Sequence, residues 1–266
     1  DNIAIGYGAM SEDTAGGTRN IAVGNYALDA LTSGDDNVAV GYDAMTANTT
    51  GGANVAVGAY ALDTNSTGDN NVAVGKVALG ANTTGAGNTA VGYASLDANT
   101  TADNNTAVGL RALSANTTGA TNTAVGMNAL ILNSTAEYNT GIGAYALAAT
   151  TTGSYNTALG RSAGLAITTG TRNIAIGVDT LKAVTTGVDN TAVGTNAASA
   201  TTGDGNVAVG KSALNANTSG NLNVAIGKLA LTANTTAENN VAVGYNAAGS
   251  NTTGTRNTAI GYGAYD

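Results

Sequence analysis

The side chains that could take part in catalysis are few in this chain of 266 residues. The sequence contains no His, no Cys, no Phe, no Trp and no Pro, and Asp and Glu together number 17. Catalysis needs a group that titrates usefully or a nucleophile that a neighbouring base activates, and no carboxylate pair recurs at a fixed spacing. We therefore expect no catalytic residue, no cofactor and no enzyme activity.

Two motifs resemble ligand-binding sites, one for phosphate and one for calcium, and neither is specific. Gly205 to Ser212 reads GNVAVGKS and matches the phosphate-loop pattern, but its middle four residues are a recurring strand segment rather than a loop that opens a helix. Asp residues in turns raise the question of calcium, although the regular calcium-binding nonapeptide is absent, so we interpret them as solvated charges and expect no metal site. These are Asp35, Asp36, Asp69, Asp103, Asp189 and Asp204.

One repeat of 17 residues accounts for the whole sequence. The consensus is N-[VTI]-A-[VI]-G-x-x-A-L-x-A-N-T-T-G-x-x, with Asn at position 1 and Gly at position 5 of every unit. The spacing is 17 except for 18 in the first unit and 16 from Asn190 to Asn206. The units begin at Asn2, Asn20, Asn37, Asn54, Asn71, Asn88, Asn105, Asn122, Asn139, Asn156, Asn173, Asn190, Asn206, Asn223, Asn240 and Asn257.

The length of the repeat predicts the fold. A period of 17 is too short for pairs of helices, and the β-branched V-A-V segment between Asn and Gly is typical of a short strand. The A-L-x-A segment that follows could be a second strand or a helical turn, and a second short strand fits better in the few residues before the N-T-T-G turn. We predict an all-β protein, a parallel β-solenoid or β-roll of about sixteen coils, with residues 1–266 as a single array without an internal boundary.

Alternation along the strand predicts which side chains point inward. Positions 3 and 5 are Ala and Gly, and small residues mark close approach of backbones, so we place them with the Ala at position 8 inside the coil. Positions 2 and 4 then form an outward apolar stripe for assembly, which includes Val38, Val40, Val55, Val57, Val72 and Val74. The alternative, with Val and Ile inside, gives a monomer with a bare flat surface.

The invariant Asn and Gly residues are predicted to be structural. Stacked Asn side chains can form an amide ladder or cap a turn. The ladder residues that we single out are Asn37, Asn54, Asn71, Asn88 and Asn105, with Gly41, Gly58, Gly75, Gly92 and Gly109.

Two further sets share a repeat position. Sequons occur at position 12, where turn formation explains the Asn more simply than glycosylation, and once more at Asn104. Tyr at positions 6 and 7 could form a sugar-stacking surface, although packing on a coil edge is the favoured interpretation. These tyrosines are Tyr7, Tyr26, Tyr42, Tyr60, Tyr93, Tyr145, Tyr245 and Tyr262.

Charge and hydropathy bear on the partners. A net charge of −8 with scattered basic residues argues against nucleic acid. No apolar run is long enough to span a bilayer, and no signal peptide precedes the array, so we expect no membrane insertion and a chain that is a mature or excised piece of a longer protein.

The N-x-A-[VI]-G-x-x-A motif resembles the head repeats of trimeric autotransporter adhesins, which are left-handed parallel β-rolls. The longer N-T-A-[VI]-G-x-x-A-L-x-x-N-T-T-G pattern is similar to arrays in phage tail fibres and bacterial surface fibres. The resemblance covers the chain and implies a left-handed homotrimer at a cell surface or on a virion fibre, although adhesin head coils are usually shorter than 17 residues.

Three functions remain as hypotheses. The first is an extracellular structural or adhesive fibre module that self-associates and meets a host-surface glycan or protein. The second is a filament subunit that stacks head to tail through open solenoid ends. The third is an ice- or glycan-binding solenoid that acts through one flat face.

Overall fold

A computed structural model describes residues 1–12 and 16–265, which form sixteen strands and no helix. The chain divides into two compact units, an N-terminal unit (Asp1–Ala136) and a C-terminal unit (Glu137–Asp266), each described by itself. The N-terminal strands are β1 (Ile3–Ile5), β2 (Ile21–Val23), β3 (Val38–Val40), β4 (Val55–Val57), β5 (Val72–Val74), β6 (Thr89–Val91), β7 (Thr106–Val108) and β8 (Thr123–Val125). The C-terminal strands are β9 (Thr140–Ile142), β10 (Thr157–Leu159), β11 (Ile174–Ile176), β12 (Thr191–Val193), β13 (Val207–Val209), β14 (Val224–Ile226), β15 (Val241–Val243) and β16 (Thr258–Ile260).

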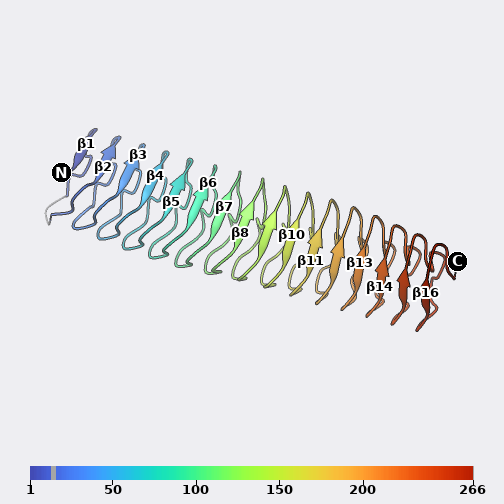
Figure 1. Cartoon of the computed structure of the whole chain (residues 1–266). Helices are drawn as coiled ribbons and strands as arrows, with labels where there is room; N and C mark the ends of the chain where they lie inside the picture. Colours follow the sequence, from blue (N-terminus) through green and yellow to red (C-terminus); the bar gives the residue numbers. More distant parts are fainter. Residues whose placement is uncertain (13–15, 266) are drawn as a thin grey trace. The chain divides into compact units, whose positions relative to one another are not determined.

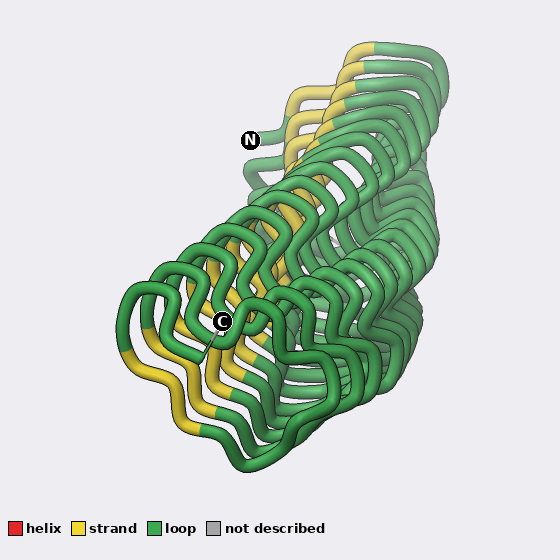
Figure 2. Tube along the Cα trace, turned by 90° about the vertical axis from the view of Figure 1, so that its right-hand side faces the viewer, coloured by secondary structure: helices red, strands yellow, loops and turns green. Residues whose placement is uncertain are grey.

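Within each unit the strands pair in parallel with one coil between neighbours, so strand order follows chain order (Figure 1). The register brings equivalent repeat positions together: Val55 lies between Val38 and Val72, and Ala stacks on Ala. The strands occupy one side of each coil, and the rest is loop and turn (Figure 2). The predicted fold class, an all-β parallel β-solenoid with coils of about 17 residues, is confirmed. The left hand and the single array without a boundary stay predictions.

The predicted second strand is wrong. Positions 6 to 11 form successive turns, in which positions 7 and 9 adopt positive φ, 54° at both Val77 and Leu79. Two turn hydrogen bonds close them, from the Ala78 N–H to the Gly75 carbonyl at 3.2 Å and from the Asn82 N–H to the Leu79 carbonyl at 3.2 Å. Positive φ is uncommon for a non-glycine residue, so local propensity does not reveal these turns.

The turns persist because hydrogen bonds between coils hold them on both sides. The Val77 N–H donates to the Ala59 carbonyl of the preceding coil at 3.0 Å, and the Leu79 N–H donates to the Ser95 carbonyl of the following coil at 2.9 Å. Backbone groups in the turns are thus paired much as those in the strand are, which offsets the local strain of the left-handed residues.

The core of each unit is a narrow column of Ala and Leu. Ala73 and Ala78, at positions 3 and 8, are fully buried, and so is Leu79 at position 9. The prediction that positions 3 and 8 point inward is confirmed, and the alternative with Val and Ile inside is wrong. The Leu at position 9 is the largest buried side chain in most coils.

Candidate interaction surface

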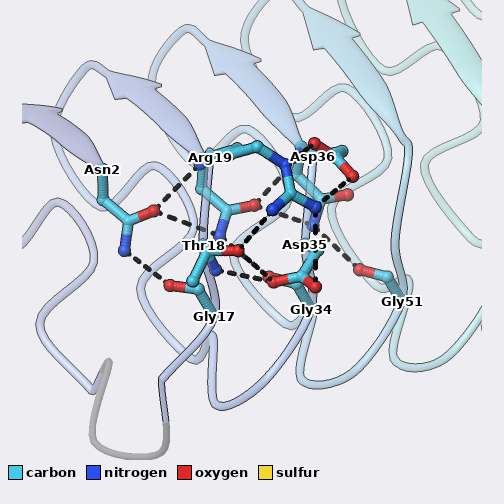
Figure 3. A network of polar contacts seen from close by, with 10 residues as sticks. Asn2, Gly17, Thr18, Arg19, Gly34, Asp35, Asp36 and Gly51 are labelled. Atoms are coloured by element: carbon cyan, nitrogen blue, oxygen red, sulfur yellow. Dashed lines mark hydrogen bonds and ion pairs between the residues drawn. The ribbon is translucent and has the colours of Figure 1, made fainter.

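The Asn at position 1 forms a ladder that ties each coil to itself and to its neighbours. In the N-terminal unit the Asn71 N–H donates to Asn54 Oδ1 at 2.9 Å, and Asn71 Nδ2 donates to the carbonyl of Gly85, at position 15 of the same coil, at 2.8 Å. Figure 3 shows the same pattern near the N-terminus, where Asn2 Nδ2 donates to the Gly17 carbonyl at 2.7 Å. Asn54 and Asn71 are fully buried, so each satisfies backbone groups that water cannot reach, whereas Asn2 is exposed.

All five predicted ladder residues take this position. Each accepts a backbone N–H from the following coil and donates to the carbonyl at position 15 of its own coil. They are Asn37, Asn54, Asn71, Asn88 and Asn105, all with no exposed surface.

A second amide ladder, at position 12, is the main feature that sequence reasoning missed. Asn82 Nδ2 donates to Asn65 Oδ1 at 2.9 Å and to the Gly85 carbonyl at 2.9 Å, and Asn99 repeats the pattern on Asn82. The Gly85 carbonyl therefore accepts from both ladders. The signal was the recurrence of Asn at one position, which the sequence also presents at position 1.

The buried ladder also bears on whether the Asn residues of the sequons at position 12 carry glycans. In the N-terminal unit the Asn side chains at this position have no exposed surface, and their Nδ2 atoms are engaged. A glycan on Nδ2 would replace those hydrogen bonds, so in the folded units turn formation accounts for these Asn residues. The sequon at Asn104 differs, because that residue is exposed.

The Gly at position 5 is a bend rather than a core residue. Gly75 has φ +134°, and a Cβ built there would lie 2.5 Å from the carbonyl oxygen of Gly92, the same position in the next coil. The predicted close approach of backbones is therefore present, but these glycines are half-exposed and do not line the interior. The same geometry recurs at Gly41, Gly58, Gly92 and Gly109.

The outward stripe is a flat surface of β-branched side chains. Positions 2 and 4 alternate with the buried Ala, and Val40 and Val57 remain 36% and 37% exposed. Val38, Val55, Val72 and Val74 are half-buried, because each is flanked by the equivalent side chains of the neighbouring coils. In the C-terminal unit Leu159 and Ile174 continue the pattern, at 47% and 39% exposed. An in-register apolar stripe of this kind is a candidate protein interface.

Tyrosines form a row on the coil edge of the N-terminal unit. Tyr7, Tyr26, Tyr42 and Tyr60 alternate between positions 6 and 7, and neighbouring rings meet edge to face with centroids 5.5, 6.2 and 5.5 Å apart. In the C-terminal unit Tyr138 stacks on Tyr155, and Tyr245 on Tyr262, both at 5.1 Å. The tyrosines at positions 6 and 7 thus pack on one another along the coil edge, whereas Tyr138 and Tyr155 stack at position 17, in the turn before the strand.

The turn carboxylates mostly serve the backbone. Asp69 Oδ1 accepts the Gly52 N–H of the preceding coil at 2.7 Å, and Asp103 Oδ1 accepts the Ala86 N–H in the same way. Asp35 accepts the N–H and the hydroxyl of Thr18, and these hydrogen bonds lower the pKa of Asp35 (Figure 3). Among the described residues no group of three or more carboxylates is placed to hold a metal ion.

Ion pairs join neighbouring coils at the same turn. The Arg19 guanidinium pairs with Asp36 through Nε and Nη2, and its hydrogen bond lowers the pKa of Asp36 (Figure 3). Arg172 and Asp189 repeat this arrangement in the C-terminal unit at 2.7 Å. Both pairs are solvent-exposed, where ion pairs contribute little to stability.

The remaining motifs contribute no site. Residues 207–209 of the phosphate-loop match form strand β13, and Lys211 is exposed beyond it, so the backbone amides do not form a phosphate cradle. Within residues 1–12 and 16–265 no helix is long and apolar enough to cross a membrane. No protein-family model matches the chain, and a search of curated proteins finds no similar sequence.

Proposed function

We propose that the chain is a structural or adhesive module of an extracellular fibre, at a cell surface or on a virion, which self-associates through the stripe at positions 2 and 4. The observation that carries the proposal is the in-register stripe on the flat face of the solenoid. The resemblance of the repeat to trimeric adhesin heads makes a homotrimer the expected state. A host glycan or protein is the expected target of such a fibre.

The energetics of the stripe favour association of copies. Full burial of a Val or Ile side chain stabilises by about 1.5–3 kcal/mol, so covering side chains that are a third exposed contributes roughly 0.5–1 kcal/mol each. Because the contribution recurs at every coil, a lateral contact along one unit gains several such terms at once. The Thr residues at position 2 retain their hydroxyls at the margin of the contact, where water satisfies them.

The test is the mass of the chain in solution. Light scattering coupled to size exclusion is expected to give about three times 25.6 kDa. Val55→Lys with Val57→Lys places two ammonium groups on the stripe and is expected to yield monomers, while Val55→Thr with Val57→Thr keeps the shape and retains most of the association. Thr84→Lys, on an exposed position away from the strands, is the matched control and should leave the mass unchanged.

A folded wild-type chain that stays monomeric at high concentration would contradict the proposal. Long fibres whose formation is insensitive to the stripe variants would instead support a head-to-tail filament. Circular dichroism of each variant separates loss of association from loss of folding.

A further inference from the structure

The tyrosine row of the N-terminal unit is an exposed aromatic surface in an acidic region. Tyr7, Tyr42 and Tyr60 remain 73%, 46% and 37% exposed. Residues 1–70, which carry the row, contain nine acidic residues and one basic residue, Arg19. Because the guanidinium of Arg19 is paired with Asp36, it does not neutralise the carboxylates near the rings.

One carboxylate lies beside the row, and a second lies close to the first. Asp43 follows Tyr42 directly, and its charge, ahead of that of Tyr60, raises the pKa of the Tyr42 hydroxyl. Asp63, in the next coil, is half-buried, and burial together with the charge of Asp43 raises its pKa. Within the described chain neither carboxylate has an ion pair of 4 Å or less with a basic residue, so no basic side chain compensates their charges.

Aromatic faces and carboxylates side by side are complementary to guanidinium groups. A guanidinium stacks on an aromatic ring, and its fixed fork pairs with a carboxylate through two hydrogen bonds, whereas an ammonium offers only a compact charge. A contact of the simpler kind is present in the C-terminal unit, where Lys228 Nζ lies 5.6 Å from the Tyr245 ring centroid. A cationic side chain on a tyrosine of this coil edge is therefore compatible with the repeat.

The spacing of the rings fits an extended polypeptide that lies along the row. In an extended chain, alternate side chains point to the same side at intervals of about 6.8 Å. The ring centroids of the row zigzag at 5.5–6.2 Å, and neighbouring coils lie about 4.8 Å apart, so about two same-side intervals of such a segment span three coils. A neutral glycan could use the rings as well, and its hydroxyls could donate to Asp43 and Asp63, but it would leave the negative charge of the two carboxylates uncompensated.

We propose that the row Tyr7–Tyr26–Tyr42–Tyr60, with Asp43 and Asp63, is a docking surface for an extended arginine-rich segment of a partner polypeptide. Arginine side chains stack on the exposed rings and pair with the two carboxylates. This binding does not depend on association through the stripe, so the two proposals fail separately.

The test uses the full chain and labelled nona-arginine and nona-lysine peptides in fluorescence anisotropy at physiological salt. We expect nona-arginine to bind at least about threefold more tightly than nona-lysine. Only a guanidinium group both stacks flat on the rings and forms two parallel hydrogen bonds with a carboxylate. Tyr42→Leu with Tyr60→Leu should lower the affinity for nona-arginine about tenfold. Asp43→Asn with Asp63→Asn should lower it by a similar factor. Tyr42→Phe with Tyr60→Phe keeps the rings and should retain most of the affinity.

The matched control is the stacked pair of the other unit. Tyr245→Leu with Tyr262→Leu removes two exposed rings from a unit whose charges balance, and should leave the affinity unchanged. Equal affinities for the two peptides, or equal losses from the two pairs of Leu variants, would overturn the proposal. So would binding of a neutral oligosaccharide that the Tyr variants abolish and the Asp variants do not affect.

Discussion

The two units repeat one coil but differ in the column at position 12. In the N-terminal unit six consecutive coils carry Asn there, from Asn48 to Asn133, and their amides form a buried ladder. In the C-terminal unit the first four coils carry Thr150, Ile167, Val184 and Thr201 at the same buried site. The corner of the coil therefore accepts either an amide ladder or an apolar column.

The difference lies in how well each column satisfies its polar atoms. An amide at this site pairs with neighbouring amides or, as at Asn217, with the backbone of its own coil, whereas an apolar residue requires no polar partner. Thr150 and Thr201 fit neither case, since their buried Oγ1 atoms have no hydrogen-bond partner among the described residues. The backbone can thus be built on either column, and mixing the two carries a cost.

Charge separates the units as well. The N-terminal unit has eleven acidic and three basic residues, a net charge of −8, and the C-terminal unit has six of each. In the N-terminal unit position 16 carries Asp35, Asp69 and Asp103 in alternate coils, with Gly52 and Ala86 between them. Like charges directly opposite in a ladder destabilise it, and alternation keeps these carboxylates two coils apart.

The largest effect should be common to both units. Gly75→Ala and Gly210→Ala each place a Cβ within 2.7 Å of the backbone of the next coil at φ +134° and +131°. We expect each substitution to lower the free energy of unfolding by at least about 3 kcal/mol, measured in urea. Gly80→Ala is the control, because its Cβ would meet nothing closer than 3.4 Å, and it should be nearly neutral. A unit that tolerates the first type of change would show that its coils are not held at this spacing.

Placing an apolar residue in the amide column, or an amide in the apolar column, should lower the free energy of unfolding by somewhat less. Asn82→Leu removes the partner of both Asn65 Oδ1 and Asn99 Nδ2, and we expect a loss of about 2–3 kcal/mol. Ile167→Asn buries an amide between coils that carry Thr150 and Val184, and we expect a similar loss. Hydrogen exchange resolved by coil should show each loss centred on its own unit. The idea of two incompatible columns would be abandoned if Ile167→Asn were neutral.

A smaller change of opposite sign should follow from removing an unpaired hydroxyl. Thr150→Val keeps the shape of the side chain and removes a buried oxygen without a partner. We expect a gain of about 1 kcal/mol in the free energy of unfolding. Thr84→Val, at an exposed position of the N-terminal unit, serves as the control and should change stability little. Destabilisation by Thr150→Val would mean that its hydroxyl is satisfied in solution.

The smallest effect concerns the carboxylates of the N-terminal unit. Burial raises the pKa of Asp63, so the stability that protonated Asp63 contributes is present below the ordinary value of 3.8 and is lost as the pH rises through its folded pKa. Asp63→Asn should therefore raise stability slightly at pH 7, by less than about 1 kcal/mol.

The contribution of Asp35 to stability should change with pH in the opposite direction to that of Asp63. Hydrogen bonds from Thr18 lower the pKa of Asp35, so its contribution is present above pH 3.8 and is lost as the pH falls through the folded pKa. Asp35→Asn should lower stability at pH 7 and leave it unchanged in strong acid. Urea midpoints between pH 2.5 and 7 would check both signs, and parallel pH curves for the two variants would contradict them.

Much of the fold could be predicted because a repeat averages out local ambiguity. The strand at Val72–Val74, the inward Ala73 and the ladder of Asn71 each recur in register, so one unit predicts the others. The turns around Val77 and Leu79 could not be predicted, since their positive φ depends on hydrogen bonds to two neighbouring coils. The tyrosine row was foreseen only as shared positions, and the nearby carboxylates were not connected with it.

The sequence by itself determined the period, the strand, its inward face and the invariant Asn and Gly, because alternation and recurrence are properties of the chain that parallel stacking preserves. Only the tertiary structure decided that the rest of the coil is turn rather than strand, that the position-12 amides form a second ladder, and that Tyr42 lies beside Tyr26 and Tyr60. Those features arise between coils, and their cause is backbone pairing across about 17 residues. No window within a single repeat contains both partners.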